Sequence, residues 1–385
     1  MYNKCIENTT FFYILVLMEI GYSKTFIQNI GSKIHRGQIL NEEESAFAAF
    51  RGAHAKILKN FRDRLSNKVS KNVAVGGRLK TRNTIIAKLQ RRYSSMDLTR
   101  MHDIAGVRLV FENNNALNNF RNSFINEPDY SNYERCNPTD KYDYIKTPNL
   151  DTGYRCIHDI YREKTDEPLK THIEIQYRTT VQQAWASTLE IWDTAFNDET
   201  KFGLSSKKDL QTLLKYISEL FARELEDMSF LKYVSDEDLF KSIIKLDKST
   251  GFISQLETIK PKQQTDKQQL SFDYLIVKDT VNSDELNVNS VKTEDAEVVF
   301  NKFKKIEDQA KQPDSNKTEE NIVMLSVKKA DKNFNKLYNN YMNDFIKFRT
   351  FYEQAIRSLK KRLGARATIY ALLLNSKYLQ KRYSE

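Results

Sequence analysis

The segment HIEIQYRT, residues 172–179, places polar side chains where they could act together. Side chains point to opposite faces at successive positions of a β-strand, so Ile173, Ile175 and Tyr177 share one face. The opposite face carries four polar side chains: His172, Glu174, Gln176 and Arg178. A strand whose outer face is solvated alternates in the same way, so this pattern needs support from elsewhere in the chain.

Basic side chains in the segment GRLKTRNTIIAKLQRR, residues 77–92, suit phosphate binding. Arg78 can stack on an adenine base or donate paired hydrogen bonds to phosphate oxygens, whereas Lys80 and Lys88 supply compact positive charges. A carboxylate follows downstream, because Asp103 begins the strand-like segment DIAGVRLVF. For any single basic residue, solvation at the surface is the alternative interpretation.

An aromatic side chain follows a glycine in the segment GYRCIH, residues 153–158. Gly153 gives the backbone freedom to turn at this point, and Tyr154 supplies an aromatic plane of the kind that can stack on a ligand ring. Stacking tolerates every base, so Tyr154 alone does not identify what is bound. His158 lies four residues later and therefore shares a strand face with Tyr154.

These residues and their order resemble the synthetase domain of the RelA/SpoT alarmone family. The matching motifs are R-x-K at Arg78, D-x-x-x-x-R at Asp103, G-Y-x-x-x-H at Gly153 and E-x-Q-x-R-T at Glu174. One such motif would be a weak signal, but all of them in the correct order are a specific one. The resemblance implies a pyrophosphokinase that transfers pyrophosphate from ATP to a ribose 3′-hydroxyl.

The resemblance also implies a role for each residue. It places the ATP donor against Arg78, Lys80 and Lys88. It places the acceptor against four residues: Tyr154, His158, Gln176 and Arg178. It makes Asp103 and Glu174 the catalytic carboxylates and the ligands of a Mg²⁺ cofactor, with Glu174 acting either on the metal or as the base for the hydroxyl. Mg²⁺ is often held by few protein carboxylates, so this ligand set is adequate.

The loop before Gly153 departs from many guanosine-tetraphosphate synthetases. Those proteins read P-K-x-N-G-Y, whereas this chain reads PNLDTGY, residues 148–154, without that Lys and that Asn. The D-T-G-Y-R loop looks like that of the CapRel-type fused toxin–antitoxin members, whose acceptor is the tRNA 3′ end and whose trigger is a phage protein. The resemblance therefore favours a tRNA acceptor and a role in phage defence. Synthesis of guanosine tetraphosphate from GDP or GTP is the alternative, and a catalytically inactive scaffold is a third interpretation.

In the CapRel-type group, a Tyr-x-x-Tyr segment of the C-terminal domain occupies the donor site. Tyr338 and Tyr341 have this spacing and are the expected regulatory residues. This interpretation predicts that truncation before about residue 272 raises activity. The chain contains 20 Tyr, so two helical Tyr that face a core are the alternative.

The expected elements give an α+β fold. Residues 1–72 are expected to be helical, 73–200 to form a synthetase domain with a mixed β-sheet flanked by helices, and 201–255 to form a helical connector. Residues 256–350 are expected to form a regulatory β-β-α-β module, and 351–385 a basic helical tail. The strands of the module are expected near residues 272–277, 286–291 and 322–327, with a helix from Ala296 between the last two.

Composition fits a globular protein with polyanionic partners. The chain has 385 residues, 40% of them hydrophobic, and a net charge of +10, which suits nucleotides and RNA. Its three Cys form no C-x-x-C pair, so we expect neither disulfides nor a cysteine zinc site, and a cytoplasmic location. The apolar run at residues 11–18 is shorter than the about 20 residues that span a bilayer, so no membrane partner is expected. That run is either a buried helix or a stretch that precedes a start at Met18.

Overall fold

The computed structural model describes most of the chain between residues 21 and 373. The described residues are 21–38, 40, 43–91, 97–127, 132–137, 140–166, 168–196, 200, 207–258, 263–264, 274–280, 285–291, 295–310, 320–326 and 340–373. The apolar run at residues 11–18 lies outside them.

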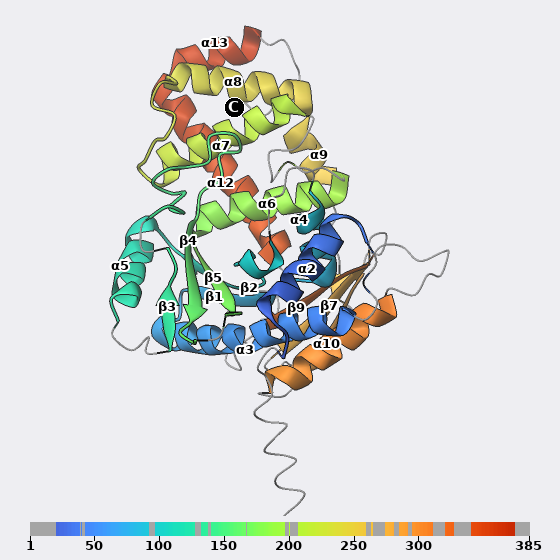
Figure 1. Ribbon diagram of the computed structural model, residues 1–385. Coiled ribbons are helices and arrows are strands. Elements are labelled where there is room, and N and C mark those ends of the chain that lie inside the picture. The colour runs from blue at the N-terminus through green and yellow to red at the C-terminus, as the bar shows by residue number, and fades with distance from the viewer. Residues whose placement is uncertain are drawn as a thin grey trace, which may run out of the picture.

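One mixed β-sheet runs through the described part of the molecule (Figure 1), in the strand order β3-β4-β5-β2-β1-β9-β7-β8-β6. The strands are β1 (Ala74–Leu79), β2 (Ala105–Phe111), β3 (Tyr133–Arg135), β4 (Ile157–Glu163), β5 (His172–Thr179), β6 (Gln263–Gln264), β7 (Tyr274–Thr280), β8 (Glu285–Val291) and β9 (Glu320–Ser326). β2 and β5 pair in parallel, whereas β4 and β5 pair antiparallel. As the alternation predicts, Ile173, Ile175 and Tyr177 of β5 are fully buried. The mixed sheet confirms the predicted α+β class.

The first hydrophobic core lies between this sheet and the helices beside it. These are α2 (Lys24–His35), α3 (Glu44–Lys68), α4 (Arg82–Gln90), α5 (Asn114–Ile125), the 3-10 turn η1 (Leu98–Arg100) and α10 (Ala296–Ala310). α3 packs across β1 and β2 and buries Phe47, Phe50, Leu58 and Phe61, which recur at helical spacing. α10 packs against α3, so a C-terminal helix covers an N-terminal one.

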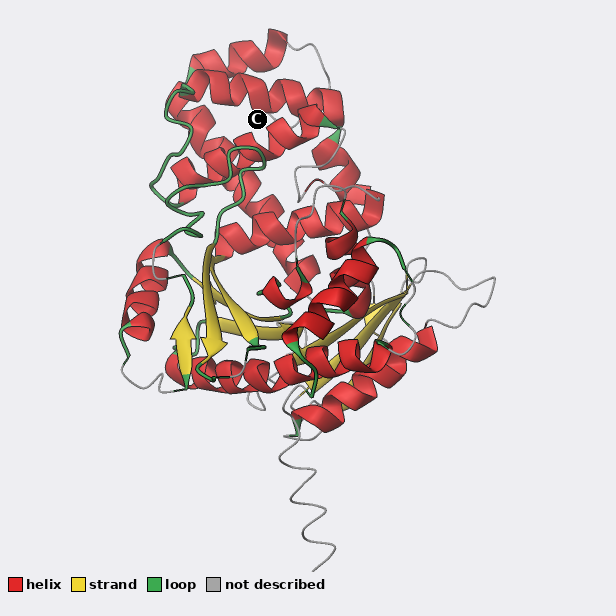
Figure 2. Cartoon of the chain, viewed as in Figure 1, coloured by secondary structure: helices red, strands yellow, loops and turns green. Residues whose placement is uncertain are grey.

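The second hydrophobic core is formed by helices alone, above the sheet in Figure 2. Its members are α6 (Thr180–Phe196), α7 (Lys208–Leu225), α8 (Asp236–Thr250), α9 (Phe252–Thr258), α12 (Asn340–Leu363) and α13 (Ala365–Leu373). α6 follows β5 directly and packs along α12. No helix in the described part of the chain combines the length and apolar character needed to cross a bilayer.

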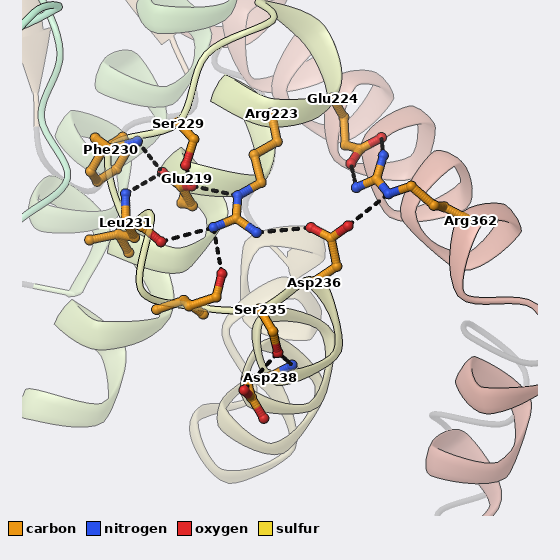
Figure 3. A network of polar contacts seen from close by, with 11 residues as sticks. Glu219, Arg223, Glu224, Ser229, Phe230, Leu231, Ser235, Asp236, Asp238 and Arg362 are labelled. Atoms are coloured by element: carbon orange, nitrogen blue, oxygen red, sulfur yellow. Dashed lines mark hydrogen bonds and ion pairs between the residues drawn. The ribbon is translucent and has the colours of Figure 1, made fainter.

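A buried carboxylate, Glu219, organises the connection between α7 and α8 (Figure 3). It accepts hydrogen bonds from two backbone N–H groups of the loop after α7, at 3.0 and 3.1 Å, and from Arg223. Arg223 donates to two carbonyls of the same loop and pairs with Asp236 at 2.8 Å. Asp236 also pairs with Arg362 at 2.8 Å. Because Arg362 lies in α12, this network fixes the end of α12 to the bundle.

The elements between residues 256 and 350 extend the central sheet. β7, β8, α10 and β9 follow one another in the order β-β-α-β. β9 pairs antiparallel with β1, with Arg78 opposite Leu325. The strand that carries Arg78 therefore has a C-terminal strand as its immediate neighbour.

Candidate active site

Two lysine ammonium groups converge on Asp103. Lys80, which directly follows β1, donates to Oδ2 of Asp103 at 2.6 Å, and Lys88 of α4 donates to both carboxylate oxygens at 2.8 and 2.9 Å. The start of α4 is set by Thr81, whose hydroxyl accepts a hydrogen bond from the backbone N–H of Thr84 at 3.1 Å. The structure thus brings together the lysines predicted for the donor and the carboxylate predicted for catalysis.

The charges of this cluster change the pKa values of its members. Burial raises the pKa of the Asp103 carboxyl, but Lys80 and Lys88 outweigh burial and hold that pKa well below its usual range. Burial lowers the pKa of Lys80 to about 8, although the Asp103 carboxylate opposes this shift. Arg78 stands two positions before Lys80 in the chain, and its charge also lowers the pKa of Lys80. Lys80 therefore loses its proton at a lower pH than an ordinary lysine.

Glu174 lies on the polar face of β5 between two partners. Its Oε2 lies 3.0 Å from Nδ1 of His158, and its Oε1 accepts from Nε2 of Gln176 at 2.6 Å. His158 reaches Glu174 because β4 pairs with β5 and places His158 opposite Gln176. Burial raises the pKa of Glu174, but the charge of His158 and the hydrogen bonds from His158 and Gln176 together outweigh burial and lower that pKa to about 2. Burial lowers the pKa of His158, yet the acidic groups around it raise that pKa well above the usual value.

Tyr154 is held by its hydroxyl. The hydroxyl lies 2.9 Å from Nε2 of His158 and accepts from the guanidinium of Arg178, also at 2.9 Å. Arg178 is 1% exposed, and its guanidinium carbon lies 5.4 Å from the centre of the Tyr154 ring. Together with Glu174, the residues predicted for the acceptor form one connected network: Tyr154, His158, Gln176 and Arg178.

Gly153 allows the loop before Tyr154 to approach α7. Its φ of +78° lies in the left-handed region, which favours glycine. A Cβ at this position would lie 2.8 Å from Cα of Lys215, and the Gly153 carbonyl accepts from the hydroxyl of Ser218 at 2.6 Å. The backbone of the Tyr154 loop is therefore fixed against α7.

Gln183 also contacts this network, although no motif pointed to it. Its Oε1 accepts from Arg178 at 3.0 Å, and Gln183 is 2% exposed. Its signal in the sequence would have been a polar side chain on the buried face of an otherwise apolar helix, because buried polar groups require partners.

Asp103 and Glu174 suit a Mg²⁺ ion in the kind of ligand they offer. Both supply carboxylate oxygens, and the charge of Asp103 raises the pKa of Glu174, so the two act on each other. Among the residues that the structure describes, no group of three or more His, Cys, Asp and Glu side chains is arranged to hold a metal ion. Two carboxylates suit an ion that takes its other ligands from substrate phosphates and water.

Comparison with known protein families identifies one matching region. Residues 77–192 match the family model described as "Region found in RelA / SpoT proteins". This range includes Lys80, Lys88 and Asp103, which form the lysine–carboxylate cluster. It also includes every residue of the Tyr154 network described above. A search of curated proteins found no match.

Solved structures of alarmone synthetases also match this chain. Small alarmone synthetase 1 from Bacillus subtilis, bound to its product pppGpp, is 19% identical with a TM-score of 0.38, and the match covers 48% of this chain and 93% of that one. Small alarmone synthetase 2 from Bacillus subtilis is 24% identical with a TM-score of 0.33, covering 44% and 90%. A GTP pyrophosphokinase family protein from Streptococcus pneumoniae is 20% identical with a TM-score of 0.35, covering 49% and 92%.

Proposed function

We propose that this chain, whose RelA/SpoT region at residues 77–192 indicates a pyrophosphokinase, transfers pyrophosphate from ATP to the ribose 3′-hydroxyl of an acceptor. The convergence of Lys80 and Lys88 on Asp103 carries the proposal. The two ammonium groups can bind a polyphosphate, and the carboxylate between them can bind the metal ion that accompanies it. In the reaction, the 3′-hydroxyl gives its proton to water and its oxygen bonds to the β-phosphorus. The bond from that phosphorus to the α,β-bridging oxygen breaks, and AMP leaves.

On the donor side, ATP competes with Asp103 for the two lysines. The triphosphate carries several negative charges, so Lys80 and Lys88 can exchange their bonds to Asp103 for bonds to phosphate oxygens. This exchange frees the oxygens of Asp103. Mg²⁺ bound there would neutralise negative charge on the phosphates during transfer. Arg78, close to Lys80, adds a further cation on this side.

On the acceptor side, the state described here favours Glu174 as a charged anchor. A general base works best with a pKa near the operating pH, whereas the pKa of Glu174 is about 2. Its carboxylate instead orients His158, which in turn holds the hydroxyl of Tyr154. We therefore assign Glu174 to holding His158 and the metal.

For the acceptor itself, we favour the tRNA 3′ end. The loop at residues 148–154 lacks the Lys and Asn that precede G-Y in many guanosine-tetraphosphate synthetases. Its own Asn149 is engaged locally, since Oδ1 accepts from the backbone N–H groups of Asp151 and Thr152 at 2.9 and 3.1 Å. A net charge of +10 also suits a large polyanion.

Transfer of label identifies the acceptor. Purified protein is incubated with ATP labelled in its γ-phosphate and with either tRNA or a mixture of GDP and GTP. We expect label on tRNA. Label on the guanine nucleotides alone would instead support synthesis of guanosine tetraphosphate, and no transfer to either would contradict the proposed function.

We expect the use of ATP to decline at alkaline pH because of Lys80. Its pKa of about 8 means that the ammonium group loses its proton between about pH 7 and about pH 9, and a neutral amine no longer attracts phosphate. The value of kcat/KM for ATP, which reports the free enzyme, should therefore fall across this range. Lys80→Arg should flatten the decline, because a guanidinium stays charged. An unchanged profile in Lys80→Arg would assign the decline to another group.

Tyr154→Ala is expected to raise KM for the acceptor more than KM for ATP. Stacking contributes about 1 to 3 kcal/mol per base, which corresponds to roughly 5- to 150-fold in affinity. Tyr154→Phe is the matched variant, because it keeps the ring and loses the hydroxyl contacts to His158 and Arg178. Steady-state kinetics with each substrate varied in turn measure both constants, and equal losses toward the two substrates would indicate a structural role.

We further propose that the C-terminal part restrains the enzyme until a phage protein binds, as in the CapRel-type group. Tyr338 and the side chain of Tyr341 lie outside the described residues. A plug that leaves about 1% of the molecules open needs only about 2.7 kcal/mol. The double change Tyr338→Ala, Tyr341→Ala should then raise activity and arrest growth, and Asp103→Ala in the same chain should restore growth. Unchanged activity in the double variant would contradict restraint by these tyrosines.

A further inference from the structure

We propose that two buried carboxylates downstream of the RelA/SpoT region position the two halves of the site. Glu307 of α10 positions the ATP side, and Asp344 of α12 positions the acceptor side. The inference rests on the proposed function, because it assigns the two halves by substrate. Neither residue lies within residues 77–192.

Glu307 forms a buried, two-pronged ion pair with Arg51 of α3. The two terminal guanidinium nitrogens of Arg51 donate to the two carboxylate oxygens at 2.8 and 3.1 Å. Arg51 is 2% exposed and Glu307 7%. A planar guanidinium that meets a carboxylate in this way has a defined orientation, so the pair fixes α10 against α3 in one geometry.

The same pair holds the segment that carries the donor lysines. Oε1 of Glu307 accepts from the backbone N–H of Arg82 at 3.2 Å, and Arg51 donates to the backbone carbonyl of Lys80 at 3.3 Å. These bonds fix both ends of the link between β1 and α4. Lys80 belongs to that link, and Lys88 lies in the helix that follows it, so the positions of both ammonium groups depend on it.

The surroundings of the ion pair are shaped to receive α10. The guanidinium carbon of Arg51 lies 5.7 and 5.5 Å from the ring centres of Phe300 and Phe303. At Gly52, a Cβ would lie 3.1 Å from the ring of Phe300, which is tighter than ordinary contact. The glycine therefore leaves room for the helix that delivers Glu307.

Asp344 positions the acceptor side of the site through Gln183. Its Oδ2 accepts from Nε2 of Gln183 at 2.9 Å and from the hydroxyl of Ser187 at 2.8 Å, and Asp344 is 2% exposed. With its amide N–H₂ held in this way, Gln183 must direct its oxygen toward Arg178, from which it accepts at 3.0 Å. Arg178 in turn holds the hydroxyl of Tyr154.

Substitution of the two carboxylates should therefore have opposite kinetic effects. Glu307→Gln should raise KM for ATP about tenfold and leave KM for the acceptor within about twofold, since small displacements of positioned groups have large effects. Asp344→Asn should raise KM for the acceptor about tenfold and leave KM for ATP within about twofold. Matched controls on the same helices are Glu297→Gln in α10 and Glu353→Gln in α12, both at exposed positions, and neither should change either constant.

A double variant separates positioning from stability. Glu307→Gln leaves the charge of Arg51 buried without its anion, which can unfold the protein. Arg51→Met, Glu307→Met removes both charges and keeps apolar contact with Phe300 and Phe303, so its thermal unfolding midpoint should stay close to that of the wild type. It still lacks the bonds to Lys80 and Arg82, so KM for ATP should remain raised about tenfold.

Several results would overturn the inference. If the folded double variant shows the wild-type KM for ATP, the ion pair is structural only. If KM for both substrates rises together in Asp344→Asn, or does not change, that carboxylate does not position the acceptor side. These outcomes presuppose an active wild-type protein, whereas a wild-type protein without transfer activity contradicts the proposed function and the inference with it.

Discussion

Asp103→Ala is expected to reduce pyrophosphate transfer by about a hundredfold or more while the protein remains folded. The change removes the carboxylate on which Lys80 and Lys88 converge and the oxygens that suit a metal ion. The Asp103 side chain is 23% exposed, so water can solvate the two lysines once it is gone. Transfer of labelled pyrophosphate under single-turnover conditions measures the loss, and thermal unfolding measures the fold.

Two further variants make this result specific. Asp166→Ala changes the same residue type at an exposed position outside the lysine–carboxylate cluster and should keep full activity. Glu174→Gln should lose activity to a similar extent, because it removes the charge that holds His158. Wild-type rates in Asp103→Ala would refute the assigned site.

The sequence predicts which of these residues share a face or a strand because the signals for that are local. Alternation in β5 places Glu174 and Gln176 on one face, and the structure pairs this strand antiparallel with β4, which carries His158. Lys80 directly follows β1 and Asp103 shortly precedes β2. The two residues lie close together because these strands are antiparallel neighbours in the sheet. What the motifs do not indicate is that the lysines bind Asp103 itself in this state.

The contacts that surround the site are not visible in the sequence because they join distant segments. Arg51 and Glu307 are separated by 256 positions, and Gln183 and Asp344 by 161. Arg51, Glu307 and Asp344 have the local signature of surface side chains on amphipathic helices. Only the tertiary arrangement shows that they are buried and paired. The pairing of β9 with β1 is equally long-range, and no periodicity within either strand encodes it.

Ending the chain after Thr258 is expected to abolish cooperative folding. The missing part contributes Ile276, Phe303 and Met324 to the first core, and each of these side chains is fully buried. The second core loses Phe348 and Leu359 of α12. Loss of a large buried side chain costs about 2 to 5 kcal/mol, and a whole domain is stabilised by only about 5 to 15 kcal/mol.

The truncation also leaves buried polar groups without partners. Arg51 loses the carboxylate of Glu307, and the amide of Gln183 loses Asp344. A buried charge without its partner costs about 3 to 5 kcal/mol. The contacts of the described residues therefore predict an unfolded, inactive product, which is the opposite of the active fragment that restraint alone predicts. Far-ultraviolet circular dichroism on heating tests this, and a soluble fragment with a sharp unfolding transition would contradict it.

The tyrosine variant distinguishes restraint from assembly because it leaves those contacts in place. Tyr338→Ala, Tyr341→Ala keeps α10, β9 and the buried residues Glu307 and Asp344. The variant therefore removes the proposed plug and leaves the core intact. If the C-terminal part both completes the fold and restrains the enzyme, the truncated chain should be unfolded and harmless, while the tyrosine variant should be folded and more active than wild type. A folded truncated chain with raised activity would show that restraint outweighs assembly, and a folded tyrosine variant with wild-type activity would leave assembly as the role of the C-terminal part.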